Sequence, residues 1–365
     1  MHQPERRSNQ RRSGANCGDM PKAHRSGTGS CVCTYLGQSR RLASSRAGST
    51  RPMFAYVVRR LISTFVVMVL VGVFVFLLLH FSPGDPATLI AGDNADAEQI
   101  ESIRKGLGLD QPLLVQFMNW SLRVLQGDFG ISVFTQAPVI NLIVERLEPT
   151  VSLAVTTLLF AALVAVAIGV VSAWKAGSWI DQVFMGGAIV GFSLPVFVVG
   201  YVLIYIFSMQ LKWLPVQGYT PIAEGVLPWA KGLILPTIAL GTSYVALIAR
   251  ITRASMLEIL SQDYMRTARA KGVSARGMLI GHALRNAGVP IVTIIGIGFA
   301  MLISGVVITE TVFNLPGVGR LVVDSIAKRD YPVIQGAIII FSGVYVLINL
   351  LIDVLYTLID PRIRY

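Results

Sequence analysis

Apolar residues in this chain are gathered into six long runs separated by polar segments. None of the runs contains Asp, Glu, Lys or Arg, and they comprise Leu61–His80, Thr150–Trp174, Val183–Phe207, Gly232–Ala249, Ala287–Thr309 and Val333–Ile352. Because a helix rises about 1.5 Å per residue, about 20 apolar residues cross a hydrocarbon layer of about 30 Å. The pattern predicts an all-α, polytopic integral membrane protein with about six transmembrane helices.

The third run is interrupted by Ser193-Leu-Pro195, and the fourth contains Pro236 near its start. A proline inside a helix frees a backbone carbonyl and bends the helix. Neighbouring helices can satisfy such a carbonyl inside a membrane. We expect a kink in the third span, and two interpretations stay open: the kink lines a pathway, or it only improves packing.

The polar segments differ in charge. Residues 87–149 carry an acidic excess and short amphipathic pieces such as Pro112 to Leu125, with Trp120, so we expect surface helices outside the membrane that rest on the spans. Asp263 to Pro290 is basic instead, with Arg266, Arg269 and Lys271 among its cations. Cationic loops favour the cytoplasmic face, and an even number of spans then places both termini there.

Within the basic stretch we expect a short helix from about Tyr264 to Lys271 that ends near Gly272. Its alanines permit close approach to a groove, and its cations can pair with acidic rims on a soluble partner. The alternative is a solvated loop that touches only lipid head groups. Spacing alone does not separate the two.

Overall composition agrees with a membrane protein, since 53% of the residues are hydrophobic and only 14% are charged, against roughly 25% charged in a soluble domain. Most of the net charge of +11 lies in residues 1–52, so it does not indicate nucleic-acid binding. We expect this Ser-, Gly- and Arg-rich stretch to be a disordered tail or a start-site artefact upstream of Met53, with a transit peptide as the alternative. Its Cys17, Cys31 and Cys33 match no zinc spacing, so no metal site is expected.

The sequence contains no motif that predicts a catalytic, nucleotide-binding or cofactor site. No Gly-x4-Gly-Lys-Ser/Thr loop occurs, so no nucleotide site or other cofactor is expected. Ion-coupled carriers place ionisable groups near the membrane midplane, whereas Glu310 and Asp353 lie only at span ends, where interfacial solvation explains them. No catalytic residue is expected, and any driving force has to come from another protein.

Several motifs after Met53 resemble one family. They are Pro83-Gly-Asp-Pro86, Leu107-Gly-Leu-Asp-Gln-Pro112, Gly127-Asp-Phe-Gly130, Tyr264-Met-Arg-Thr-Ala-Arg-Ala-Lys-Gly272, His282-Ala-Leu-Arg-Asn-Ala287, Glu310-Thr-Val-Phe313 with Leu315-Pro-Gly-Val-Gly319, and Asp360-Pro-Arg-Ile-Arg-Tyr365. Together they are similar to the B-type permease subunit of dipeptide and oligopeptide ATP-binding-cassette importers.

The resemblance implies a type I ABC importer permease fold and a function as half of a translocation pathway in a bacterial inner membrane. The implied partners are a second, homologous permease subunit, two ATP-binding subunits in the cytoplasm and an extracytoplasmic substrate-binding protein. The ATPases would bind ATP and dock on a coupling helix formed by Tyr264, Arg266, Thr267, Ala268, Arg269, Lys271 and Gly272.

The expected division is a tail (1–52), a first span with an extracytoplasmic region (53–149), and a permease core with five spans (150–365) that includes a coupling loop at 251–286. The substrate class stays open between dipeptides, longer peptides, glutathione and nickel chelates, and no substrate-contacting residue is predicted. The alternative function is a self-sufficient secondary transporter or channel, and a cargo-free membrane scaffold is the third class.

Overall fold

The computed structural model describes residues 53–81, 87–88, 96–106 and 109–359. The tail with its three cysteines, the Pro83–Pro86 motif, the start of the Leu107–Pro112 motif and the Asp360–Tyr365 motif lie outside the described residues. The unit from Pro52 to Tyr365 is therefore considered by itself.

Five helices in the described part are long and apolar enough to cross a membrane. They are α2 (Met53–Phe81), α7 (Leu147–Trp174, which continues from the short α6, Val139–Val144), α10 (Val226–Leu260), α12 (Arg285–Val312, preceded by the π-helical η4, Gly277–Leu284) and α14 (Tyr331–Ile359). A bent pair of helices supplies a sixth candidate span. The prediction of an all-α protein with about six spans is confirmed.

The third predicted span is broken rather than kinked. Helix α8 (Trp179–Ser193) and α9 (Val196–Leu203), which continues into the π-helical η2 (Ile204–Gln210), meet at an angle of 105°. Pro195 has no amide hydrogen, and it disfavours helical geometry in the residue before it. Leu194 accordingly adopts an extended conformation, with φ −85° and ψ 129°, so the helix stops and restarts in a new direction.

Several helices extend beyond the apolar runs that predicted them. Helix α10 continues past Arg250 and Arg253 to Leu260, although we expected those two arginines to mark the end of the span. Charged residues are good helix formers, so a change from apolar to charged sequence marks a membrane boundary without ending the helix. The predicted loop after the fourth span is correspondingly shorter.

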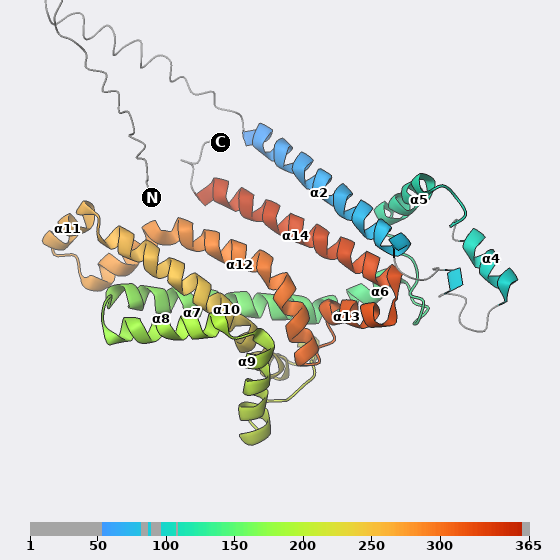
Figure 1. Ribbon diagram of the computed structural model, residues 1–365. Coiled ribbons are helices and arrows are strands. Elements are labelled where there is room, and N and C mark those ends of the chain that lie inside the picture. The colour runs from blue at the N-terminus through green and yellow to red at the C-terminus, as the bar shows by residue number, and fades with distance from the viewer. Residues whose placement is uncertain (1–52, 82–86, 89–95, 107–108, 360–365) are drawn as a thin grey trace, which may run out of the picture. The chain divides into compact units, whose positions relative to one another are not determined.

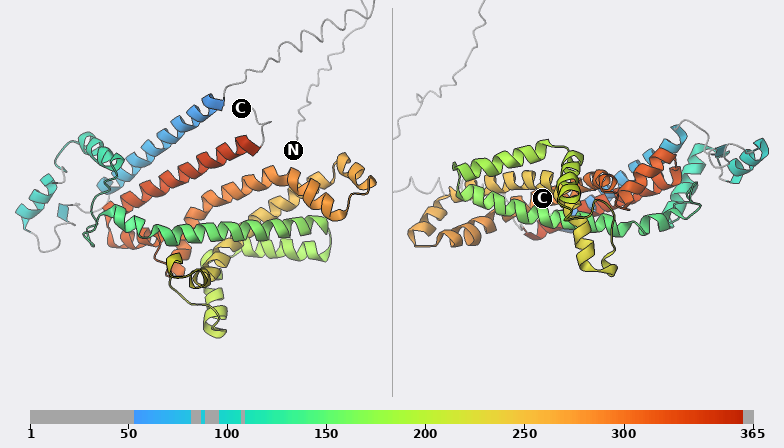
Figure 2. Two further views of the ribbon diagram at one scale, coloured as in Figure 1. Left: turned by 180° about the vertical axis from the view of Figure 1, so that it is seen from behind. Right: turned by 90° about the horizontal axis from the view of Figure 1, so that it is seen from below.

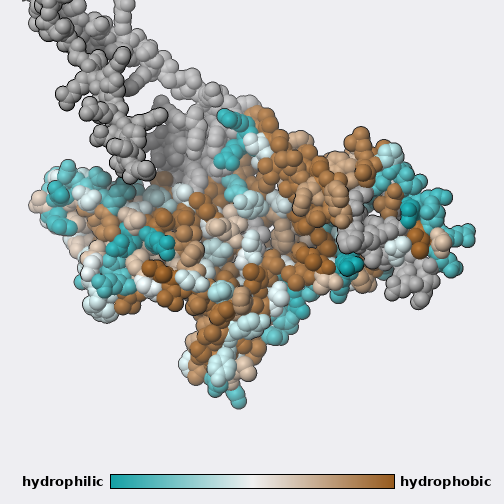
Figure 3. Space-filling view, viewed as in Figure 1, coloured by the Kyte–Doolittle hydropathy of each residue, from teal (hydrophilic) through white to brown (hydrophobic). Residues whose placement is uncertain are grey.

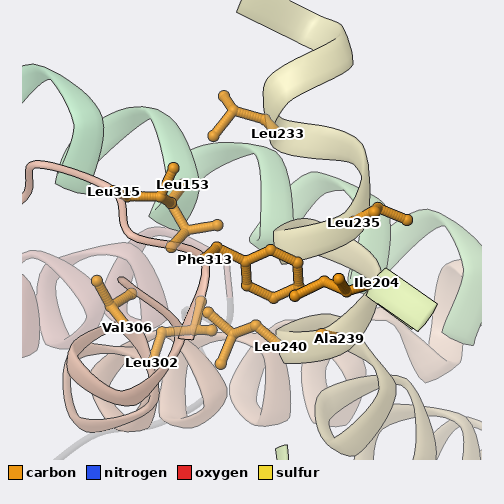
Figure 4. Packing of buried hydrophobic residues seen from close by; sticks show 10 residues of the cluster. All are labelled: Leu153, Ile204, Leu233, Leu235, Ala239, Leu240, Leu302, Val306, Phe313 and Leu315. Atoms are coloured by element: carbon orange, nitrogen blue, oxygen red, sulfur yellow. The ribbon is translucent and has the colours of Figure 1, made fainter. Parts of the chain in front are cut away.

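Helices α7 and α10 pack along each other and against α12 (Figure 1). The largest buried cluster fills this junction, and in Figure 4 the ring of Phe313 lies among Leu240, Ile204 and Leu153. Gly241 of α10 faces the ring of Phe160. A glycine there permits the close backbone approach that is typical of packing between membrane helices.

The first and last spans form a pair at the edge of this core. Helices α2 and α14 lie side by side in opposite views (Figures 1 and 2). The side-chain amide of Gln335 donates to the carbonyl oxygen of Val75 at 3.1 Å across the pair. Because both residues lie within apolar helices, this bond satisfies a polar side chain that lipid could not.

Short helices occupy the two ends of the bundle. Helix α11 (Asp263–Ala270) lies at one end, and α4 (Ala97–Gly106), α5 (Leu113–Leu125) and α13 (Val318–Lys328) lie at the other (Figure 1). Hydrophilic residues gather around α11 and α4, with hydrophobic residues between them (Figure 3). This distribution suits a protein whose two polar ends face water on opposite sides of a membrane.

Candidate functional site

Helix α11 has distinct start and stop signals. Gln262 precedes it in an extended conformation, and Asp263 in the first turn complements the helix dipole. At the other end, the amide of Val273 donates to Ala268 O and that of Gly272 to Arg269 O, while Gly272 has a φ of +82°. This is a Schellman motif, which needs a left-handed residue at the glycine position. The expected helix, with its end near Gly272, is confirmed.

Most of the residues predicted for docking are exposed on or directly after this helix. Only Met265 of α11 is buried. Ala268 is half-buried, and the other predicted residues are exposed, namely Tyr264, Arg266, Thr267, Arg269, Lys271 and Gly272. Arg266 Nη1 lies 3.5 Å from Asp263 Oδ1 in an exposed pair, which is a weak interaction. The cationic side chains of Arg266, Arg269 and Lys271 are therefore available to a partner.

Helix α11 is attached to the bundle by few contacts. The side chain of Met265 enters a buried cluster built from α7, α10, η4 and α12, which includes Ala173, Met256, Met278 and Ala283. Asn286 Nδ2 donates to the hydroxyl of Tyr264 at 3.2 Å and to the carbonyl of His282 at 2.8 Å. The helix is thus linked to the start of α12 by one buried side chain and one exposed hydrogen bond.

A cavity of about 470 Å³ lies behind the loop. Its lining comes from the ends of α7 and α10 and from the residues after α11, and it includes Trp174, Leu260, Arg269, Val273 and Met278. The following segment, η4, is a π-helix, a form that is rare and frequent at functional sites. The loop therefore has space behind it and an irregular joint after it.

An ion pair between a buried carboxylate and a half-buried arginine at the same end of the bundle was not predicted. Arg253 of α10 donates from Nε and Nη2 to the two carboxylate oxygens of Asp181 in α8, at 2.7 and 2.6 Å. Ser172 Oγ donates to Asp181 at 2.6 Å and the amide of Gly177 at 3.0 Å, and Asp181 is 4% exposed. Such bidentate geometry is the strongest form of Arg–carboxylate pairing. It joins α7, α8 and α10 about three turns before α11.

Glu310 at the other end corrects the expectation of simple interfacial solvation. Its side chain is completely buried. The hydroxyl of Thr150 donates to Oε1 at 2.6 Å and the amide of Arg320 to Oε2 at 2.9 Å, and the amide of Gly319 also donates. The carboxylate thus caps the N-terminus of α13, where unpaired amides and the helix dipole favour an anion.

The Leu315-Pro-Gly-Val-Gly319 motif fits around that carboxylate. A side chain at Gly317 or Gly319 would overlap Glu310, so glycine is required at both positions by space. Burial raises the pKa of Glu310, although the hydrogen bonds from Thr150 and the two amides oppose the rise. Thr150 Oγ1 also accepts from the amide of Val318 at 2.9 Å. The motif is a joint between α7, α12 and α13.

A second buried carboxylate, that of Asp330, forms hydrogen bonds at the same end of the bundle as Glu310. Asp330 is 4% exposed and accepts hydrogen bonds from Ser132 Oγ at 2.5 Å and from the amide of Val133 at 3.3 Å. Neither carboxylate has a metal-like neighbourhood, and the searched, described residues contain no group of three or more His, Cys, Asp or Glu that could hold a metal ion. Hydrogen bonds within the chain account for both groups.

Comparison with known proteins connects these features to a family. Residues 165–365 match the model of the binding-protein-dependent transport system inner membrane component, and residues 53–154 match the N-terminal model of the corresponding membrane component. The three buried carboxylates of Asp181, Glu310 and Asp330 fall within the first match, as does α11.

Two curated relatives are similar over 313 residues, which is 86% of this chain and the full length of each relative. One is 58% identical and is named "Probable peptide ABC transporter permease protein y4tP", from Sinorhizobium fredii. The other is 47% identical and is the glutathione transport system permease protein GsiC of Escherichia coli K12. Among solved structures, the MetNI methionine ABC transporter in inward-facing conformations is 16% identical, with a TM-score of 0.47 over 60% of this chain and 96% of that chain.

Proposed function

This chain belongs to the family of binding-protein-dependent transport system inner membrane components, and from that premise we propose that it is the permease subunit of an ATP-driven importer of short peptides. It is a multi-pass inner membrane protein. The relatives support the substrate class, since one carries a peptide transporter name and the other transports glutathione, which is itself a tripeptide. Dipeptides, longer peptides and glutathione all fall within this proposal.

The exposed cationic surface of α11 carries the proposal. Arg266, Arg269 and Lys271 project from a helix that has only one buried side chain. A short helix held in this way is suited to a groove on a separate protein. We assign it to the cytoplasmic ATP-binding subunits, which bind the ATP, with Tyr264, Thr267, Ala268 and Gly272 completing the contact surface.

The arrangement around α11 suggests how force is passed on. ATP-driven closure of the partner would move α11, and the cavity behind the loop leaves room for that movement. Arg253 in α10 and Asp181 in α8 then move together because their side chains are paired. The movement reaches the bend at Pro195, where α8 and α9 change direction. This chain performs no covalent chemistry in the scheme.

A second, homologous permease subunit would complete the pathway. After the 105° bend, α9 and η2 expose large apolar side chains, with Tyr201 59%, Tyr205 55% and Met209 59% exposed. We assign this face to the second subunit. The extracytoplasmic binding protein would deliver substrate at the opposite end from α11, and we assign both termini to the cytoplasm. The core at 150–365 then carries the pathway, and 53–149 supplies the first span and outer region.

Charge reversal on α11 tests the proposal. In the complete importer, Arg266→Glu with Arg269→Glu should abolish ATP-dependent peptide uptake while the protein still inserts, because an acidic rim on the ATPase would repel it. Lys328→Glu, an exposed reversal on α13 at the other end, is the matched control and should bind the ATP-binding subunits normally. Normal uptake by the α11 variant would refute the docking assignment.

A separate measurement distinguishes the proposal from the alternative of a self-sufficient carrier. The chain alone in sealed vesicles, with an ion gradient and without ATP-binding subunits, should accumulate no peptide. Uphill uptake under these conditions would favour the secondary transporter.

A further inference from the structure

Helix α5 differs from the short helices α4 and α11 because its apolar side chains extend around most of its circumference. Its sequence is LLVQFMNWSLRVL, and none of its residues is buried. We propose that α5 is an interfacial helix embedded in the outer leaflet of the membrane, with one apolar face on α2 and a second apolar face on lipid. This inference does not depend on the peptide-import function.

The first face of α5 fixes its position against α2. The ring of Phe117 lies 5.4 Å from that of Phe76 in an edge arrangement, and the ring of Trp120 lies 5.7 Å from it. Trp120 also approaches Gly72, since a Cβ there would lie 3.9 Å from its ring. Aromatic pairs of this kind are favourable beyond the area they bury, so the helix is held firmly along α2.

These contacts place α5 at membrane depth. The apolar span of α2 is Val58–Leu78, so Phe76 and Gly72 both lie inside it. At about 1.5 Å per residue, Gly72 is about 9 Å from the outer end of that span. Interfacial helices lie about 5–10 Å into the boundary between head groups and acyl chains, and tryptophan is enriched there. A helix resting in water outside the membrane would not reach these residues.

The second face of α5 lies beside the first and has no partner within the described residues. Leu114, Met118 and Leu122 follow one another at the i, i+4 spacing of a helix face and are 71%, 57% and 55% exposed. Leu125, on the same side, is 83% exposed. The neighbouring helix α2 also exposes large apolar side chains, with Phe74 and Phe81 63% and 80% exposed. Lipid is the environment that covers exposed apolar faces at this depth.

Three of the four polar side chains of α5, those of Gln116, Asn119 and Arg123, form a narrow third strip, and the small, half-buried Ser121 lies between the two apolar faces. Gln116 Nε2 donates to the carbonyl of Gln111 at 2.8 Å, and Asn119 Nδ2 donates to the side-chain oxygen of Gln111 at 3.3 Å. The strip therefore points toward the preceding polar segment. By contrast, α4 carries Glu98, Glu101, Arg104 and Lys105 in ten residues and has the composition of a solvated helix.

Site-directed spin labelling of the full chain in lipid vesicles tests the inference. Cys17, Cys31 and Cys33 are first replaced by serine, and one nitroxide is then placed at position 114, 118 or 122, or at the control positions 119 and 123, which are exposed on the same helix. We expect labels on the apolar face to collide several-fold more often with lipid-soluble oxygen than with a water-soluble nickel complex. The order should reverse at 119 and 123.

Two results would overturn the inference. Equal access of the nickel complex to all five positions would place α5 in water. Exclusion of both reagents from 114, 118 and 122 in the assembled importer would show that a protein covers this face. Photolabelling of the unmodified chain with an apolar carbene reagent provides a measurement without substitutions, and label should appear on Leu114, Met118 and Leu122 but not on Asn119 or Arg123. Since neither measurement uses transport, failure here is separate from failure of the import function.

Discussion

Helix α11 and the Glu310 site at the opposite end of the bundle use charge in opposite ways. At one end, α11 exposes its cations and buries only Met265. At the other, Glu310 is completely buried and its carboxylate accepts hydrogen bonds from Thr150 and from backbone amides of α13. Exposed charge without internal partners is suited to another protein, whereas a buried and fully bonded carboxylate fixes the positions of its neighbours. The comparison separates a docking surface from a structural joint.

The largest expected effect is a loss of stability in Gly317→Ala, which disrupts the joint between α7, α12 and α13 around Glu310. The new methyl group would overlap the Glu310 carboxylate, so that side chain would leave its pocket and the donors around it would lose their acceptor. We expect a loss of more than about 3 kcal/mol of stability, since a buried ionised group and its donors are separated. Thermal unfolding in detergent and the amount of protein in membranes measure it. Gly288→Ala in α12, where the added atom meets nothing within 4 Å, should leave both values unchanged or slightly raised.

Breaking the Asp181–Arg253 pair should come next. Arg253→Met keeps much of the side-chain volume but leaves a 4%-exposed carboxylate without its cation, at a cost of about 3 kcal/mol. Because the pair joins α8 to α10, peptide uptake per ATP hydrolysed should also fall. Arg250→Met removes an exposed arginine from the same helix and serves as the control. An unchanged ratio in the Arg253 variant would mean that the pair has no part in force transmission.

Met265→Ala should have a smaller effect, confined to the docking end. Truncating this buried side chain costs about 2 kcal/mol, the low end for such substitutions, because one side of α11 is open and can relax. We expect faster hydrogen exchange of the α11 amides and weaker ATPase binding, with little change in exchange at α13. An equal increase in hydrogen exchange at the amides of α11 and α13 would show that the two ends are not structurally independent.

The smallest expected effect is a pH dependence from Glu310. Burial raises its pKa in the folded protein, so the folded state binds that proton more tightly than the unfolded state. The stability contribution is therefore complete below the ordinary glutamate pKa and is lost as the pH rises through the raised value. Relative to Glu310→Gln, which does not titrate, the native chain should become more stable as the pH falls through the raised pKa of Glu310. A relative loss on acidification would contradict this assignment.

Local patterns predicted the spans and the bounds of α11 well. Length and apolar composition identify α2, α7, α10 and α14, and the glycine after Lys271 identifies the end of α11. Helix boundaries were less predictable because Arg250 and Arg253 mark the membrane surface without ending α10. The residues around Pro195 predicted an interruption of the third span, but the 105° angle between its two helices depends on packing that no local pattern encodes.

Contacts between residues far apart in the sequence could not be predicted either, because they also depend on packing that no local pattern encodes. Asp181 looked like an ordinary loop residue, and its partner Arg253 lies 72 positions later. Glu310 is bonded to Thr150, 160 positions away. A signal did exist for Glu310, since two glycines in Gly317-Val-Gly319 closely follow an acidic residue at a span end. That spacing suggests a carboxylate enclosed by backbone, although only the fold shows which hydroxyl completes it.

The pairing of α2 with α14 also has a consequence for biosynthesis. The carbonyl of Val75 receives its hydrogen bond from Gln335, which is 260 positions further along the chain. At roughly 5–20 residues per second, a ribosome needs on the order of 10 to 50 s to add that stretch. During this interval the first span is already in the bilayer without its final neighbour. Until α14 is inserted, lipid or an insertion chaperone therefore has to cover the face of α2 that α14 later contacts.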